Sequence, residues 1–508
     1  MEIFTDLRDI NKKSITQKNI KFYYFFEKSD LSDVLNELQS IDLSNKEELV
    51  KFVKKQDGFF KFGIWNKNFF FGAVDQLASK SILYKIQNKK LFIYFNPPLN
   101  EKIETQALVD IFYSGYTLKN KTIFGGIKIL MPGEYLYLNN KSNNYLIAKW
   151  NMFNPKYLSK INESKNFEKL LDNTFSKIKN NYKDKKYLVA LSAGFDSRLI
   201  VSLMKELEMD FETFTYGFTN QRDFKITEKI CKKLDVKNHK IIMDSAKAKI
   251  YNSNNFEKFL RFNNFGISAN NFGDYGPLSF LEHKINKTEF VIINGQAGDF
   301  LTGAHLPINI VSSKYSLQKN KSLLFKFILD KHYGLWDSIN KDIKESYLNR
   351  VDEYYFKKVK NYLDLLKAYE IYEFENRQSK WVTGQQKVYD FFGYAWDLPL
   401  WKISFMSFFL NNISLREKIN QSYYKKFLIK KNYYGIWKNV QINPKLSFPI
   451  WIKLIRLFFK SIFFFISKKK WHHFQKKYLE YFYDPTGVSK LIRYDLYIRL
   501  TSTPRNYK

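Results

Sequence analysis

The hydrophobic positions of the first 140 residues form short aromatic runs separated by turn residues. The runs occupy residues 21–26, 57–65, 68–75, 80–86, 89–96 and 134–139. Apolar runs of this length, bounded by Gly, Pro, Asn and Asp, are typical of strands joined by turns. A helix is expected over 105–116 and a Pro-Gly turn at 132–133. The pattern predicts an antiparallel β-rich domain over 1–150, with a polar linker over 139–165.

From residue 187 the pattern changes to apolar strands that alternate with amphipathic helices. Strands are predicted at 187–191, 211–218, 239–243 and 290–294, and helices at 198–207 and 225–234. This order predicts an α/β domain with a parallel sheet, because parallel strands need helical crossover connections. We expect this domain to span residues 165–430. The sequence is mostly helical in period from about residue 322, and a basic, aromatic helical tail is predicted over 431–508.

Composition excludes several classes of protein without selecting a function. The 508 residues are 45% hydrophobic and 18% aromatic, which favours packed cores over disorder. Lys and Arg outnumber Asp and Glu by 83 to 50, so the formal charge is +33. A coding bias toward Lys, Asn, Ile, Phe and Tyr explains this charge better than an anionic partner does. Because no basic helix, zinc spacing or RNA-binding motif accompanies it, no nucleic-acid partner is expected.

Cysteine usage and the first residues bear on the compartment. The single cysteine, Cys231, falls in the predicted helix 225–234, which indicates a buried structural residue and not a nucleophile. One cysteine forms no intramolecular disulfide, so a reducing compartment fits. The sequence MEIFTDLRDINKKS lacks the apolar core of a secretory signal. The sequence therefore predicts a cytoplasmic protein.

A candidate phosphate-binding loop, SAGFDS at residues 192–197, follows the first strand of the α/β region. In open α/β sheets, ligands collect at the carboxyl ends of the strands, where backbone N–H groups face a phosphate. Ser192 and Ser197 supply hydroxyls, and Gly194 permits close approach. Asp196 can hold Mg²⁺ at a polyphosphate. Without a family, the string fits a plain strand-to-helix turn equally well.

The string SAGFDS resembles the SGGxDS pyrophosphatase loop of the asparagine synthetase family, from which it departs only at Ala193. A second segment, NGQAGDFLTG at residues 294–303, is similar to the family's SGEGSDExFGG and keeps Gly295 and Asp299. The resemblance extends over roughly residues 50–410. Ordered matches of this kind are improbable by chance.

Two further segments carry the resemblance. TFTYGF at residues 213–218 looks like the family's second strand, whose backbone at the position of Tyr216 contacts adenine. ENRQSKW at residues 375–381 looks like the helical portion that closes the site, with Arg377 at a recurrent arginine position. The lysine that stabilises the adenylation transition state is not singled out by the sequence, and Lys387 is one of several candidates.

The resemblance implies a fold, a cofactor and a set of site residues. The implied fold is a degenerate class II glutaminase-like (Ntn, α+β) domain followed by an adenine nucleotide α-hydrolase-like synthetase domain. The implied cofactors are ATP and Mg²⁺, with Asp196 and Asp299 holding the metal on the leaving pyrophosphate. The expected catalytic residues are Asp196, Asp299 and Gln296. The expected nucleotide-binding residues are Leu191, Ser192, Gly194, Asp196, Ser197, Tyr216, Asn294 and Gly295.

Two departures from the family limit the predicted activity. Glutamine-dependent members carry a cysteine directly after the initiator Met, where this chain has Glu2. Because a carboxylate cannot replace a thiolate nucleophile, we expect no glutaminase activity and a packing role for this domain. Gln296 stands at the position of the family's acid-base Glu, and Phe300 replaces another acid. Since Gln cannot titrate, adenylation is expected to persist while amide formation differs from asparagine synthesis.

These features predict an asparagine synthetase-like, AMP-forming carboxylate-amine ligase. It adenylates a small-molecule carboxylate and forms an amide with a substrate amine or ammonia. The alternative is a catalytically degenerate nucleotide-binding homologue that acts as a partner or scaffold protein, for example in surface-polysaccharide biosynthesis. The missing nucleophile and Gln296 favour that alternative.

Residues 449–471, PIWIKLIRLFFKSIFFFISKKKW, form a separate candidate. Lys453, Arg456 and Lys460 are spaced by three and four residues and so share one helical face. These charges interrupt the run of about 20 apolar residues that a transmembrane helix needs. Two interpretations remain open. The segment is either an in-plane helix on anionic lipid at the inner face of the membrane, or a helix packed on the domain with a solvated basic stripe.

Overall fold

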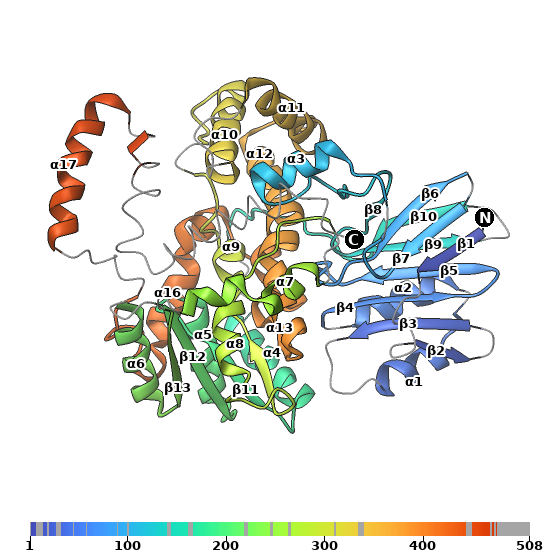
Figure 1. Ribbon diagram of the computed structural model, residues 1–508, viewed down its shortest axis with the longest axis horizontal. Coiled ribbons are helices and arrows are strands. Elements are labelled where there is room, and N and C mark those ends of the chain that lie inside the picture. Colours follow the sequence, from blue (N-terminus) through green and yellow to red (C-terminus); the bar gives the residue numbers. More distant parts are fainter. Residues whose placement is uncertain are drawn as a thin grey trace.

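The computed structural model describes most of the chain (Figure 1). The described residues are 2–6, 14–17, 20–26, 32–43, 45–56, 58–88, 90–98, 101–139, 144–160, 166–217, 222–243, 247–262, 266–308, 311–333, 340–442, 450–467, 470, 471 and 474. A β-rich N-terminal part lies beside an α/β and helical part, and helix α17 stands apart from both (Figure 1).

Two sheets build the N-terminal part. The larger is antiparallel, in the order β10-β9-β5-β4-β3-β2, and the smaller has the order β1-β7-β6-β8, with β1 parallel to β7. The strands are β1 (Glu2–Asp6), β2 (Ser14–Gln17), β3 (Ile20–Phe26), β4 (Phe60–Trp65), β5 (Phe69–Val74), β6 (Leu83–Gln87), β7 (Lys90–Tyr94), β8 (Lys128–Ile129), β9 (Glu134–Asn139) and β10 (Asn144–Lys149). Helices α1 (Ser32–Ser40), α2 (Lys46–Lys55) and α3 (Thr105–Ser114) accompany them.

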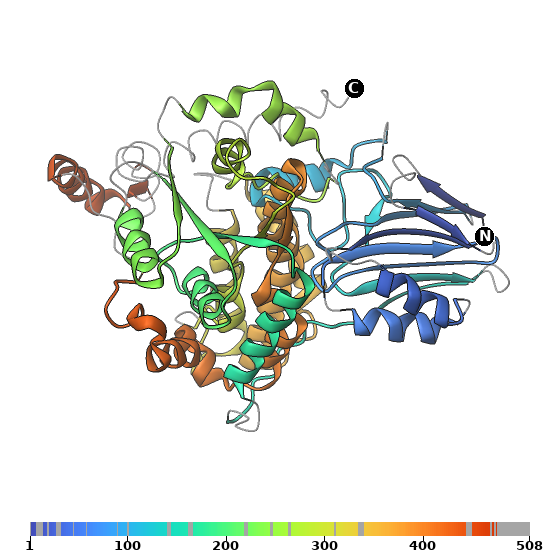
Figure 2. The same cartoon turned by 90° about the horizontal axis from the view of Figure 1, so that it is seen from below.

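The alternation of side chains along β4 and β5 explains the layers. Phe60, Phe62 and Phe71 belong to one buried cluster with residues of α1 and α2. Trp65 and Phe70 point to the opposite face and belong to a second cluster with β6 and β7. Successive strand residues face opposite sides, so these strands are buried on both faces and read as nearly continuous aromatic runs. Figure 2 shows the blue helices lying against one face of the blue strands.

Strand β10 lies within the segment that the sequence predicts as a polar linker. It pairs antiparallel with β9, with Tyr145 opposite Leu138 and Ile147 opposite Leu136. The four consecutive apolar residues of its YLIA core belong to the edge strand of the large sheet, although the residues around them are polar. The linker prediction is therefore wrong for residues 144–149.

A five-stranded parallel sheet forms the centre of the second part, as predicted. Its order is β13-β12-β11-β14-β15, and every pair is parallel. The strands are β11 (Lys186–Ala190), β12 (Phe211–Gly217), β13 (Asn238–Ile242), β14 (Phe290–Ile293) and β15 (Ala395–Asp397). The chain moves outward from β11 to β13 and then returns to the other side of β11 at β14. Such a reversal opens a crevice at the carboxyl ends of β11 and β14, where α/β proteins bind ligands.

Helices surround this sheet and continue beyond it. They are α4 (Phe167–Asn181), α5 (Asp196–Glu206), α6 (Arg222–Leu234), α7 (Asn254–Arg261), α8 (Tyr275–Leu281), α9 (Gly298–Thr302), α10 (Leu317–His332), α11 (Lys341–Val351), α12 (Tyr362–Glu373), α13 (Gln386–Phe392), α14 (Ile403–Asn411), α15 (Leu415–Lys418), α16 (Ser422–Lys431) and α17 (Ile450–Ile466). Short 3₁₀ helices span Lys247–Asn252, Thr383–Gln385, Pro399–Trp401, Ile419–Gln421 and Tyr433–Gly435, and π-helical turns span Asp352–Phe356 and Phe374–Val382. Cys231 is buried in α6, as expected.

Buried ion pairs join the N-terminal part to the helical part. Glu375 is buried and accepts from the ammonium groups of Lys119 and Lys149 at 2.7 and 2.6 Å. Arg350 makes a bidentate pair with the buried Asp110, with both N···O distances 2.7 Å. Breaking a buried pair of this kind typically costs several kcal/mol. The N-terminal part is therefore joined to the helical part by buried charges.

Candidate active site

Two loops meet at the crevice beside β11. The first is SAGFDS, which leads from β11 into α5, and the second leads from β14 into α9. The backbone N–H of Asp299 donates to the Asp196 carboxylate at 2.9 Å. The two acids that the sequence paired across 103 positions are therefore brought together.

Two glycines permit this close approach. A Cβ atom on Gly295 would lie 3.0 Å from the backbone nitrogen of Ser197. A Cβ atom on Gly298 would lie only 2.4 Å from Oδ1 of Asp196 and 2.7 Å from a methyl group of Leu400. Contacts below 3 Å are repulsive, so a side chain at Gly298 would push the second loop away from Asp196.

We expect the substitution Gly298→Ala to weaken binding of Mg-ATP by about 10- to 100-fold, because overpacking a tight contact costs about 1–3 kcal/mol. Isothermal titration with ATP and Mg²⁺ measures the effect. Gly384→Ala is the matched control, since a Cβ atom there meets nothing within 4 Å. Equal affinities of the two variants would contradict the requirement for close approach.

Hydrogen bonds within SAGFDS set the shape of the loop. The N–H of Ser192 donates to the Ser197 hydroxyl at 3.0 Å, and the N–H of Gly194 donates to the Ser192 hydroxyl at 3.2 Å. The N–H of Ala193 donates to the Asp223 carboxylate at 3.2 Å. Asp223, at the start of α6, was not predicted. Leu191 directly follows β11, and its N–H donates to the Phe214 carbonyl at 2.9 Å.

Asp196 and Asp299 sit in different electrostatic surroundings. Burial, and next the nearby Asp299, raise the pKa of Asp196 to about 7. The Tyr424 hydroxyl donates to Asp196 at 3.0 Å. Burial also opposes ionisation of Asp299, but its contact with His305, at 3.2 Å between Nε2 and Oδ2, brings the pKa of Asp299 below its usual value. A cation between the two acids would favour the ionised form of both.

His305 is held by a fully buried carboxylate, Glu373. Nδ1 of His305 lies 2.5 Å from Glu373, which also accepts from Lys331 at 2.7 Å and from the Tyr369 hydroxyl at 2.5 Å. Arg377, the predicted arginine position, is 3.4 Å from the same carboxylate. Burial disfavours the imidazolium, but Glu373 and Asp299 outweigh it and raise the pKa of His305 to about 9. Glu373 thus connects three basic side chains to the acid pair.

Amide groups surround Gln296. Its side chain donates to Gln385 at 2.5 Å and accepts from Gln386 at 2.9 Å, and its N–H donates to the Asn294 side chain at 2.9 Å. Its immediate hydrogen-bond partners are therefore neutral. The position is oriented for hydrogen bonding, and it supplies no titrating group.

A second network ties the end of β14 to the end of β12. The Asn294 side chain donates to the Tyr389 hydroxyl at 2.7 Å, and Tyr389 donates to the buried Asp274 at 2.5 Å. The Tyr216 hydroxyl donates to the other oxygen of Asp274 at 2.8 Å. The side chain of Tyr216 is thereby fixed beside the expected nucleotide-binding edge, and the residues that fix it, Asp274 and Tyr389, were not predicted.

Two buried lysines have lowered pKa values. Burial lowers the pKa of Lys380 to about 7, but its ammonium group donates to the carbonyls of Thr117 and Lys119 and so has a structural contact. Burial lowers the pKa of Lys387, in α13, to about 8. Lys387 follows Gln386, which contacts Gln296, and therefore stays a candidate for the unidentified lysine.

The carboxylates fit a magnesium ion that is shared with phosphates. Across the described ranges, no group of three or more His, Cys, Asp and Glu side chains forms a ready-made metal cage. Mg²⁺ is usually bound by one or two carboxylates together with substrate phosphates and water. Asp196 and Asp299 provide such a pair, and each carboxylate oxygen keeps a lone pair beyond its hydrogen bond.

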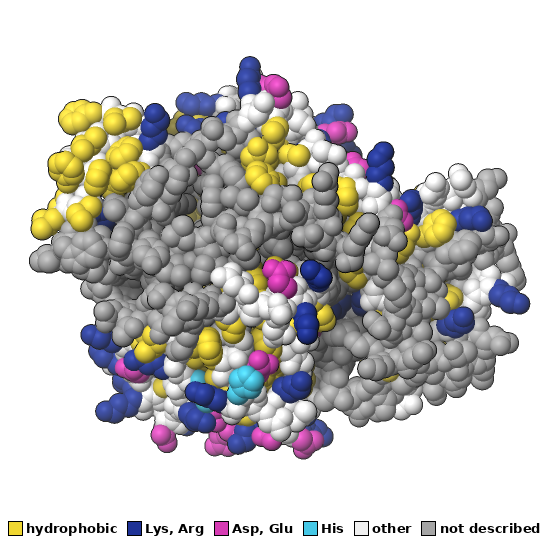
Figure 3. Space-filling model, viewed as in Figure 1, with side chains coloured by type: hydrophobic (Ala, Val, Ile, Leu, Met, Phe, Trp, Pro, Cys, Tyr) yellow, Lys and Arg dark blue, Asp and Glu magenta, His cyan; other side chains and the backbone are white. Residues whose placement is uncertain are grey.

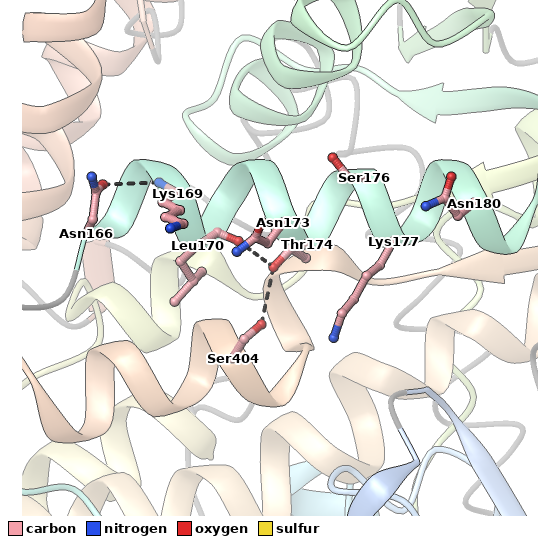
Figure 4. Close-up of a pocket in the computed structure, with 9 residues that line it drawn as sticks. All are labelled: Asn166, Lys169, Leu170, Asn173, Thr174, Ser176, Lys177, Asn180 and Ser404. Atoms are coloured by element: carbon pink, nitrogen blue, oxygen red, sulfur yellow. Dashed lines mark hydrogen bonds between the residues drawn. The ribbon is translucent and has the colours of Figure 1, made fainter.

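Two cavities differ in their relation to these acids. One, of about 330 Å³, opens beside His305 and is lined by Ala304, His305, Leu306, Pro307, Ile308, Phe327 and Lys331. The other, of about 630 Å³, runs along α4 and reaches Ser404 on α14, whose hydroxyl lies 3.2 Å from that of Thr174 (Figure 4). The α4 groove contains none of the predicted site residues. No predicted site residue lines the first cavity either, but His305 does, and its Nε2 lies 3.2 Å from Oδ2 of Asp299.

Comparison with protein families identifies the central part of the chain. The family model described as asparagine synthase matches residues 168–361. Residues 168–361 form an asparagine synthase domain. The match runs from α4 past α11 and includes SAGFDS and NGQAGDFLTG, the two segments on which the family was recognised. Together with the parallel sheet and the β-rich N-terminal part, it confirms the predicted fold class.

Solved structures show weaker likenesses, and no curated protein matches the chain. NMN synthetase from Francisella tularensis is 16% identical, covers 42% of this chain and 92% of its own, and has a TM-score of 0.23. NH3-dependent NAD synthetase from Campylobacter jejuni is 17% identical, covers 42% of this chain and 93% of its own, and has a TM-score of 0.21. A glutamine phosphoribosylpyrophosphate amidotransferase from B. subtilis is 10% identical over 45% and 72%, with a TM-score of 0.17. These scores are too low to support a function.

The asparagine synthase domain alone does not complete the site. Glu373, Gln385 and Tyr424 lie beyond residue 361 and reach the loops from helical elements. His305 could have been identified from the sequence, because it lies two positions after the end of NGQAGDFLTG. No local sequence pattern pointed to Tyr424, because its contact with Asp196 joins residues that are 228 positions apart.

Proposed function

We propose that this protein is an ATP-dependent, AMP-forming carboxylate-amine ligase of the asparagine synthetase type. The observation that carries the proposal is the hydrogen bond between the Asp299 N–H and the Asp196 carboxylate. It joins the two family segments at the switch point of the parallel sheet, where nucleotides bind in α/β proteins. ATP and Mg²⁺ are the proposed cofactors.

Each site residue then has a proposed role. Ser192, Gly194, Ser197 and Gly295 line the phosphate side, and Tyr216 with Asn294 borders the adenine side. Asp196 and Asp299 hold the metal, which neutralises charge on the departing pyrophosphate when it is bound. Leu191 directly follows β11 and leads into the loop. These residues act by positioning the substrate carboxylate toward the α-phosphorus.

The cavity beside His305 is the proposed place of the acid substrate. Its wall combines apolar groups, Leu306 and Phe327, with the cation of Lys331. A small organic acid with an apolar portion fits such a lining, since few polar groups fix orientation in an otherwise apolar pocket. The cavity adjoins His305, which contacts Asp299. The acid would therefore lie next to the metal-binding pair.

Amide formation is proposed to proceed without an acid-base group at Gln296. The amide of Gln296 hydrogen-bonds an acyl group or the incoming nitrogen. A substrate amine or free ammonia is the proposed nitrogen donor. Asparagine itself is one candidate product, while a sugar acid or another carboxylate is equally compatible with the replaced acids.

ATP–pyrophosphate exchange, measured across a panel of small acids, tests this function. We expect exchange above background with at least one acid, dependent on Mg²⁺. If the protein binds ATP but no acid in a broad panel supports exchange, the degenerate homologue acting as a partner or scaffold replaces the ligase. The missing Cys and the neutral Gln296 are the observations that favour that second candidate.

Glutamine should not serve as nitrogen donor. Glu2 begins β1, which pairs parallel with β7, and a carboxylate lacks the nucleophilicity of a thiolate. We therefore expect no glutamate release from glutamine, and Glu2→Ala should leave exchange unchanged. A large effect of Glu2→Ala on exchange would contradict the packing role of the N-terminal part.

We also propose three units, residues 1–150, 165–430 and 431–508, and residence in the cytoplasm. The single buried cysteine supports a reducing compartment. Contact with the inner face of a membrane through residues 449–471 is proposed as an additional property, independent of the chemistry.

A further inference from the structure

Helix α17 exposes large apolar side chains over much of its length. Phe464 and Phe465 are 82% and 87% exposed, and Leu454 is 64% exposed. Among the residues of the helix whose exposure is described, Ile455, Leu457, Phe458, Ile462 and Ile466 are also exposed. Figure 3 shows hydrophobic side chains gathered at the corner where Figure 1 places α17. Contiguous apolar patches of this kind mark interaction surfaces.

Another side of the helix is covered. Phe459 packs on Phe474 at 4.8 Å between ring centroids, and Phe463 packs on Phe474 and Trp471 at 5.0 and 5.9 Å. Trp471 is buried. Phe459 and Phe463 are four residues apart, so the aromatic cluster occupies one stripe of the helix. The exposed residues lie on the remaining surface. These exposed side chains favour the in-plane helix over the alternative of a helix packed on the domain with a solvated basic stripe.

Basic groups flank the exposed apolar surface. Arg456 and Lys460 are four residues apart and therefore share one face of the helix. Leu454, Phe458 and Phe465, at spacings of four and seven residues, lie on another face of the helix. The helix sequence, IWIKLIRLFFKSIFFFI, contains no acidic residue. In the part of the chain that is described, no helix is both long and apolar enough to cross a membrane.

We infer that α17 docks the protein on an anionic lipid surface, with the helix in the plane of the interface. Its 17 residues would lie over about 25 Å of surface. Leu454, Phe458 and Phe465 would enter the acyl boundary, and Lys460 would contact the headgroups. In-plane helices combine apolar burial with attraction to anionic lipid in this way.

The charge of α17 favours lipid over a second copy of the chain. A twofold contact through this face would bring like-charged helices together with no acid in either to neutralise them. Anionic headgroups provide the complementary charge. The formal charge of +33 acts in the same direction, because it draws the whole molecule toward a negative surface.

A buried arginine connects the segment before α17 to the phosphate loop. Arg198 donates to the carbonyls of Ile436, Val440 and Gln441 at 2.8 to 2.9 Å, and to that of Ala193 at 3.2 Å. Its guanidinium also lies over the Trp437 ring. Since residues 442–449 are too few to span more than about 30 Å, docking through α17 would hold the candidate active site close to the lipid surface.

Flotation with liposomes tests the inference on the full-length protein. The double substitution Phe458→Glu, Phe465→Glu should reduce the fraction bound to phosphatidylcholine vesicles containing phosphatidylglycerol by at least about tenfold. Met152→Glu is the matched control, because Met152 is 62% exposed and Phe458 63% exposed, and Met152 lies outside α17. The control should bind as the unchanged protein does.

The charge has its own test. Lys460→Glu should reduce binding to anionic vesicles at low salt, while Lys229→Glu, an exposed lysine on α6, should alter this binding far less. Absence of vesicle binding, or equal binding by the double variant, overturns the inference. A dimer in sedimentation experiments that the double variant abolishes, without vesicle binding, assigns the face to a second copy and also overturns it. None of these measurements requires ATP, so they are independent of the proposed function.

Discussion

Asp196→Ala and Asp299→Ala are each expected to abolish ATP–pyrophosphate exchange, with a loss of at least about 10³-fold, which corresponds to about 4 kcal/mol of transition-state stabilisation. Each substitution removes one of the two acids whose loops meet at the crevice, where the Asp299 N–H donates to the Asp196 carboxylate. With a single carboxylate, the metal would lose both affinity and position at the departing pyrophosphate. Exchange with the best acid of the panel measures the effect.

The design separates loss of chemistry from loss of fold. Asp196 accepts from Tyr424 and from the Asp299 N–H, so Asp196→Asn, which keeps the shape of the side chain, should be folded and inactive. Glu2→Ala provides an acid-to-alanine change remote from the proposed chemistry. Exchange within a factor of about ten of the unchanged protein in either Asp variant would contradict the metal role, since the loss of a positioned charged group costs more.

Glu373→Gln is expected to destabilise the protein by about 3–5 kcal/mol, the cost of leaving buried cations without their partner. Glu373 is fully buried between His305, Lys331 and Arg377, and the basic groups hold its pKa well below the usual value despite burial. Urea unfolding at neutral pH measures the difference.

The pH dependence of this effect follows from linkage. A carboxylate whose pKa is lowered by folding stabilises the protein above its unfolded pKa of 4.5, and the contribution is lost as the pH falls through the folded pKa. The difference between Glu373→Gln and the unchanged protein should therefore be largest above pH 4.5 and shrink in acid. Glu353→Gln, at an exposed position, should change stability by less than about 0.5 kcal/mol. If Glu373→Gln lowered the free energy of unfolding by no more than this control does, the buried network would not contribute to stability.

Local sequence identified the fold class and the two loops. The runs 60–65 and 69–74 read as strands because short aromatic segments lay between turn residues, and β4 and β5 are found there. SAGFDS and NGQAGDFLTG were each short enough to recognise as strings, and the family match includes both. β10 was missed because its four apolar residues lie among Asn, Lys and Ser.

The sequence by itself determined most of the strands of both parts and the two loops that meet at the crevice, and it predicted that Gln296 and Glu2 stand where the family has reactive groups. These properties follow from residue type and spacing over a few positions. Only the tertiary structure decided that Glu373 holds His305 against Asp299, that Tyr424 reaches Asp196, and that the apolar face of α17 is exposed. Contacts between residues tens to hundreds of positions apart depend on how helices pack, and hydrophobic periodicity gives the buried face of a helix without naming its partner.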